Sequence, residues 1–171
     1  YEDWNQTILT HELVHILHIE TVEGLPGAVR AVLGRVISVN RVSPGWVIEG
    51  FATFQETRHT TAGRGRSTIA HMIKRMAALE DGFPPLGTMD GWIREPPGGN
   101  LRYLFGQDFI QFIADTRGED VWTDWIHSYG RGIPYLLPGK RVFGKRLVPL
   151  YKEWREEFLA HYQRQADEVI A

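Results

Sequence analysis

Residues 11–15 read HELVH, so two histidines flank a glutamate at a spacing that can support metal chemistry. In an α-helix, residues four apart lie on one face and one turn apart, so His11 and His15 can direct their imidazoles at a single ion. Glu12 is displaced sideways and can reach a water on that ion rather than the ion itself. The segment predicts His11 and His15 as metal ligands and Glu12 as a general base.

The part of this helix around the histidines is largely apolar on all sides. Leu13, Val14, Ile16 and Leu17 surround the histidines, and this pattern predicts a buried helix. Buried imidazoles need polar partners, and a cation supplies them. The alternative interpretation is an exposed helix face that carries two ordinary histidines.

A catalytic zinc ion normally has three protein ligands and one open position. The sequence contains no cysteine, and Thr21, six residues after His15, offers no third imidazole, so a carboxylate is expected as the third ligand. Glu49 lies in the first turn of a helix expected over residues 46–58 and otherwise rich in apolar residues. We predict Glu49 as the third ligand; the alternative is a glutamate that is favoured there by the helix dipole alone.

Two further polar residues share the face of Glu49. Thr53 and Glu56 follow it at i+4 and i+7, which places all three in one stripe. Side chains that accept a hydrogen bond from a metal-bound imidazole fix its orientation. We therefore predict that Thr53 or Glu56 supports one of the histidines. Gly50 and Ala52 are small and allow this helix to approach the first one closely.

Composition limits the class of protein. With 171 residues, of which 43% are hydrophobic, we expect one domain over residues 1–171 with a substantial core. The formal net charge of −2 provides no electrostatic footprint for nucleic acid, and no apolar run approaches the ~20 residues of a membrane span. The chain begins at Tyr1 without a signal-like segment, so we expect a piece of a longer protein.

The sequence pattern predicts a mainly α fold with few strands. Residues 37–42 fit either a short strand or an extended connection, and residues 82–100, rich in proline and glycine, predict a long surface loop. Ser67 and Asn100 are expected to cap helices. The expected helices are residues 1–18, 28–36, 46–58, 67–80, 101–116, 119–129 and 148–170.

Together these motifs resemble the gluzincin metallopeptidases, the group of thermolysin and the zinc aminopeptidases. The segment WVIEGFATFQE at residues 46–56 is similar to the tryptophan-containing NEGFA segment of the aminopeptidases, whose glutamate is a zinc ligand. The likeness to bacterial peptidase MA-like domains covers most of the chain, through HELxH, LPG, PGWxxEGxA, GRGRS and a tyrosine-glycine helix.

The resemblance implies the helical lobe of a zincin-like metallopeptidase that uses Zn²⁺ to hydrolyse a peptide or protein substrate. It implies His11, His15 and Glu49 as the ligands of the ion. It also implies that Tyr103, in a segment like the Tyr-x-x-Gly of aminopeptidases, stabilises the oxyanion. Domains of this type often lie beside a β-propeller domain, and we expect such a neighbour and an extracytoplasmic bacterial location.

Three other polar residues have open interpretations. Arg64 and Arg66 precede a predicted helix, and their guanidinium groups fit a substrate carboxylate, an internal acid or a solvated loop. We predict substrate binding for both. His18 is either a group that contacts the substrate or the ligands, or a polar residue near the end of its helix.

Three other functions are compatible with the sequence. The first is a domain that holds zinc without turnover and serves as an interaction module for an attached domain, although the intact Glu12 argues against it. The second is a zinc hydrolase for a non-peptide amide or ester, because the same ligands serve all carbonyl hydrolyses. The third is a structural domain without a metal.

Overall fold

The structure is a computed structural model, which describes residues 4–36, 38–90, 98–132 and 136–170. None of these residues lies in a strand, so the expected mainly α class is confirmed. No described helix is long and apolar enough to cross a membrane. The α-helices are α1 (Trp4–Glu20), α2 (Gly24–Leu33), α3 (Gly45–His59), α4 (Thr68–Leu79), α5 (Leu101–Arg117), α6 (Asp120–Gly130), α7 (Leu136–Val142) and α8 (Leu147–Ile170).

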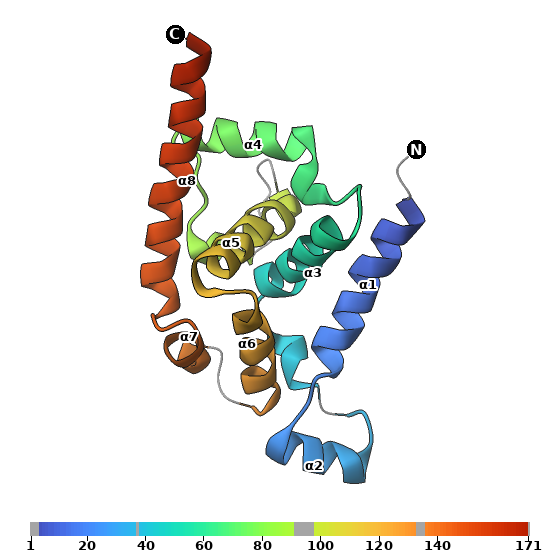
Figure 1. The fold of residues 1–171 in the computed structure, drawn as a ribbon. Coiled ribbons are helices and arrows are strands. Elements are labelled where there is room, and N and C mark those ends of the chain that lie inside the picture. The colour runs from blue at the N-terminus through green and yellow to red at the C-terminus, as the bar shows by residue number, and fades with distance from the viewer. Residues whose placement is uncertain (1–3, 37, 91–97, 133–135, 171) are drawn as a thin grey trace.

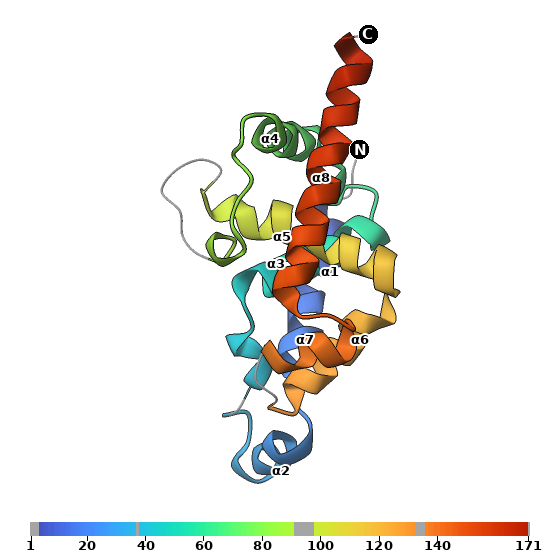
Figure 2. The same ribbon diagram turned by 90° about the vertical axis from the view of Figure 1, so that its left-hand side faces the viewer.

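Helix α5 lies at the centre of the molecule, between α3 and α8 (Figures 1 and 2). Its side chains Phe105, Phe109, Ile110 and Ile113 are fully buried. Trp154 of α8 stacks on Phe109 with the ring centroids 4.9 Å apart. Helix α1 packs along the outer side of α3, so the order across the molecule is α1, α3, α5, α8.

Helices α3 and α5 touch through their backbones. A Cβ atom on Gly50 would lie 2.6 Å from the carbonyl carbon of Gly106, which is closer than real Cβ contacts allow. The absence of a side chain at both positions is therefore what permits the crossing. The crossing fixes Glu49, which precedes Gly50, relative to Tyr103, which lies one turn before Gly106.

Two predicted segments differ in the structure. Helix α2 begins at Gly24 rather than residue 28, because Pro26 lies in its first turn, where no hydrogen-bonded N–H is required. The helix ends at Leu33 rather than residue 36, and Gly34, which follows it, has a φ of 79°. Residues 39–42 form neither a strand nor an extended connection but the 3-10 helix η1 (Val39–Val42); residue 37 lies outside the described residues.

The predicted caps have different outcomes. The Ser67 side chain accepts a hydrogen bond from the Ala70 N–H, as expected. Asn100 makes no such bond, because it already has helical dihedral angles at the end of the 3-10 helix η4 (Gly98–Asn100), which runs directly into α5. The loop between α4 and α5 contains the 3-10 helix η3 (Leu86–Thr88). It is not confined to the surface, since Phe83 and Met89 are buried in the core; residues 91–97 lie outside the described residues.

The expectation that α1 is buried on every side was wrong. Leu13, Ile16 and Leu17 are 54%, 59% and 62% exposed. The helix packs with one face only, and the apolar composition of the other face does not bring it into the core. The buried residues of α1 are Thr7, His11 and His18.

We expect Gly50→Ala to destabilise the protein, because the added methyl group would meet the backbone of α5. Overpacking against backbone atoms costs roughly 1–3 kcal/mol or more in the free energy of unfolding, which chemical denaturation would measure. Gly139→Ala in α7 is the matched control, since the nearest atom to its Cβ lies 3.8 Å away. Equal stability of the two variants would contradict the close crossing.

Candidate metal centre

Helix α1 brings the two predicted histidines together. The Nε2 atoms of His11 and His15 lie 3.0 Å apart, and the rings meet edge to face with their centroids 4.6 Å apart. This geometry follows from the i, i+4 spacing on a regular helix.

Helix α3 adds the carboxylate of Glu49. Its Oε2 atom lies 3.4 Å from His11 Nε2 and 3.2 Å from His15 Nε2. A tetrahedral ion with bonds of ~2.0–2.1 Å has ligand atoms about 3.3–3.4 Å apart. The three atoms therefore form a triangle of the size that one such ion requires, and the residues fit a divalent metal.

Behind the triangle, a second carboxylate supports His11. Its Nδ1 atom lies 2.8 Å from Oε2 of Glu56, whose side chain is 0% exposed. A donated Nδ1–H leaves the lone pair on Nε2, the nitrogen that faces Glu49. Glu56 thus occupies the predicted supporting position. Thr53 does not: its hydroxyl is buried and has no hydrogen-bond partner among the described residues.

The loop after α3 holds Glu56 in place. Oε1 of Glu56 accepts hydrogen bonds from the backbone N–H of Arg64 at 2.9 Å and from its Nε at 3.0 Å, and Oε2 accepts one from its Nη2 at 3.2 Å. Of the interpretations for Arg64, the geometry favours the internal acid. Arg66 donates to the carbonyl of Thr60 at 2.7 Å. Substrate binding by either arginine stays a prediction.

The glycines on both sides of Arg64 explain how the loop reaches Glu56. A Cβ atom on Gly63 would lie 2.1 Å from the Cα atom of Thr57, and one on Gly65 would lie 2.8 Å from a Thr57 methyl carbon. The loop is therefore pressed against the end of α3. The Gly-Arg-Gly pattern was the signal in the sequence that the backbone around this arginine packs closely against α3.

Two more predicted residues lie beside the triangle. The carboxylate of Glu12 is exposed, and its ligand atom and those of His11 and His15 lie within 4.8 Å of one another. Glu49 already has ligand spacing to both histidines, and Glu12 is exposed to solvent. The ring of Tyr103, on α5, stacks on His11 with centroids 6.2 Å apart. The guanidinium group of Arg64 also lies over the Tyr103 ring, with Cζ 4.7 Å from the ring centroid.

The ionisation of the site depends on its paired charges. Burial alone lowers the pKa of His11, but the contacts with Glu49 and Glu56 outweigh burial and raise it above 6.5. Burial raises the pKa of Glu49, yet the two histidines outweigh this and hold it well below its usual range. The pKa of Tyr103 is raised by burial, by the charge of Glu49 and by a hydrogen bond to Glu49, so its hydroxyl keeps its proton.

Comparison of the chain with protein-family models, with curated proteins and with solved structures gives no match. The interpretation of this site therefore rests on its own geometry, which is that of two imidazoles and one carboxylate around a common point, with the exposed Glu12 close to the two histidines.

We expect Glu56→Gln to weaken zinc binding by about 10–100-fold, the usual cost of losing a carboxylate that supports a ligand histidine. The amide can still accept the Nδ1–H bond but no longer balances the charge of Arg64. Competition with a coloured chelator would measure the affinity. Glu157→Gln, an exposed change on α8, is the control. Unchanged affinity in Glu56→Gln would show that this carboxylate does not support the site.

We expect zinc affinity to rise with pH. Because the pKa of His11 is raised, the metal-free ring is mostly protonated near pH 6.5, and the ion has to displace that proton. Affinity should increase by up to about tenfold per pH unit below the raised pKa and level off above it. Calorimetry in buffers of different ionisation enthalpy would count the released proton. An affinity that is constant between about pH 6 and 8 would contradict the assignment.

Proposed function

We propose that this chain is a zinc-dependent hydrolase of peptide bonds. The observation that supports this most directly is the triangle of His11 Nε2, His15 Nε2 and Glu49 Oε2, with edges of 3.0, 3.2 and 3.4 Å. Two imidazoles and one carboxylate with an open corner are the ligand set of catalytic zinc. The HExxH motif and the resemblance to gluzincins favour a peptide as the substrate.

Two further groups near the triangle, Glu12 and Tyr103, support the proposed reaction. An ion held here supplies Lewis acidity and a low-pKa water at neutral pH. Glu12 is exposed and adjacent, and it would accept the proton of the attacking water and pass it to the leaving amine. Tyr103 keeps its proton and would donate a hydrogen bond to the developing oxyanion.

A second candidate is a zinc-holding domain that binds a partner without turnover. The exposed apolar side chains of Leu13, Ile16 and Leu17, on the helix that carries the histidines, favour it. The two candidate functions differ in the role of Glu12: a hydrolase needs it as a general base, whereas a purely structural metal site does not use it.

We expect Glu12→Gln to keep zinc and lose several orders of magnitude in turnover, because the amide cannot accept the proton. Hydrolysis of a library of quenched fluorescent peptides, with and without chelator, would measure turnover, and elemental analysis would measure zinc. Glu80→Gln, at an exposed position after α4, is the control. A fully active Glu12→Gln would eliminate the assigned base, and chelator-resistant activity would eliminate the metal mechanism.

A further inference from the structure

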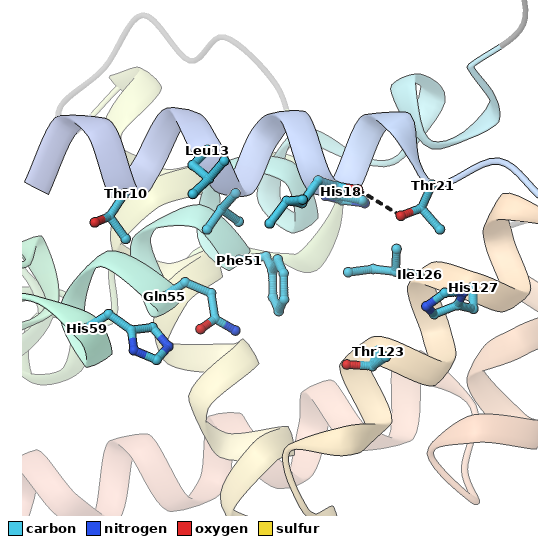
Figure 3. A pocket seen from close by; sticks show the side chains of 12 residues that line it. Thr10, Leu13, His18, Thr21, Phe51, Gln55, His59, Thr123, Ile126 and His127 are labelled. Carbon is cyan, nitrogen blue, oxygen red and sulfur yellow. Dashed lines mark hydrogen bonds between the residues drawn. The ribbon is translucent and has the colours of Figure 1, made fainter.

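A cavity of about 460 Å³ lies between α1, α3 and α6 (Figure 3). This volume is within the range of small-molecule sites, which are roughly 300–1,000 Å³. Its walls are largely apolar, and polar side chains such as Gln55 and Thr123 also line it. The apolar side chains that line it are Leu13, Val14, Leu17, Phe51 and Ile126.

One residue of the wall does not suit an empty apolar cavity. His18 is 2% exposed, and neither of its ring nitrogens has a hydrogen-bond partner among the described residues. A neutral imidazole has one donor and one acceptor nitrogen, and leaving such groups buried and unpaired is unfavourable. His11, on the same helix, has a carboxylate at each nitrogen. A leucine at position 18 would complete the apolar wall without this cost, so the imidazole calls for a partner.

The charges around the cavity indicate a neutral partner. No lysine, arginine, aspartate or glutamate is among the described residues that line it. At its edge, the Nδ1 atom of His127 is already paired with Glu23. Burial, with a smaller contribution from His15, lowers the pKa of His18 to about 4, so the ring is uncharged near neutral pH. A carboxylate or an ammonium group would lose its hydration here without gaining an opposite charge.

We propose that this cavity binds a small, neutral, mainly apolar molecule with a hydroxyl group, and that the hydroxyl pairs with a ring nitrogen of His18. A hydroxyl group fits either ring nitrogen, because it both donates and accepts. The apolar body of the ligand fills the space beside Phe51, whose ring meets that of His18 edge to face with centroids 6.0 Å apart. His18 lies on the same face of α1 as His11 and His15, but neither of those histidines nor Glu49 lines the cavity, so the proposal does not depend on the proposed hydrolase.

Binding of 4-ethylphenol, ethylbenzene and the 4-ethylbenzoate anion to the 171-residue chain tests this, with and without zinc. We expect the Kd of 4-ethylphenol to be about fivefold below that of ethylbenzene, the ratio that one hydrogen bond of roughly 1 kcal/mol gives, and 4-ethylbenzoate to bind most weakly. The ring ¹⁵N resonances of His18 should shift with the phenol and not with ethylbenzene. The same preference is expected in both metal states, so its failure would leave the proposed hydrolase untouched.

His18→Leu is the decisive variant. In it, the Kd values of 4-ethylphenol and ethylbenzene should become about equal. We expect it to fold, since it replaces an unpaired polar group with an apolar one. His59→Leu, at an exposed position that also lines the cavity, is the matched control and should keep the preference. No saturable binding at millimolar concentration, a preference that survives His18→Leu, or unmoved His18 ring resonances would each overturn the proposal. The resonance measurement uses the unmodified chain and stays decisive if the variant does not fold.

Discussion

The buried charge of Glu56 is the constraint on which the rest of the site depends. A carboxylate with no exposed surface loses its hydration, which costs several kcal/mol unless hydrogen bonds and an opposite charge replace the water. Arg64 supplies the charge and His11 the fourth hydrogen bond. The hydrogen bonds of Glu56 thereby connect three elements: α1, α3 and the loop after α3. Helix α1 brings His11 to the site, and the bond from its Nδ1 to Glu56 determines that Nε2 is the nitrogen that faces Glu49.

The three carboxylates of the site become more exposed to solvent from Glu56 outward. Glu56 is closed off, the side chain of Glu49 is 20% exposed, and Glu12 lies in solvent. Without an ion, a proton on His11 and the charge of Arg64 together balance the two inner carboxylates, Glu49 and Glu56, and these carboxylates are the reason for the raised pKa of His11. A divalent ion bound on the Nε2 side would take the place of that proton: Arg64 would still balance Glu56, and Glu49 would cancel one of the two charges of the ion. The group would therefore carry one net positive charge with the ion bound and none without it.

The sequence predicted what lies within one helix better than what lies between helices. The spacing of His11 and His15 and the stripe of Glu49 and Glu56 follow from helix geometry, and α3 and α4 have nearly the expected ends. Apolar composition does not determine which neighbour covers a helix, so the burial of α1 was misjudged. The helical spacing predicted that Glu56 lies beside the proposed ligands. It did not predict the contact of Glu56 with Arg64, because the position of Arg64 depends on a loop whose path is set by packing against Thr57. Tyr103 was predicted through resemblance alone, because its position depends on the crossing of α3 and α5.

Three histidines on one face of α1 show how surroundings rather than residue type determine chemistry. His11, His15 and His18 follow at i, i+4 and i+7. His11 meets two carboxylates and has a raised pKa, whereas His18 meets none and has a pKa of about 4, although both are buried. Desolvation acts on both rings in the same direction, so the opposite outcomes come from the carboxylates of α3. Those carboxylates lie against His11 and His15, whereas His18 faces Phe51 and the apolar cavity. One helix thus presents the same side chain to an ionic site and to an apolar one.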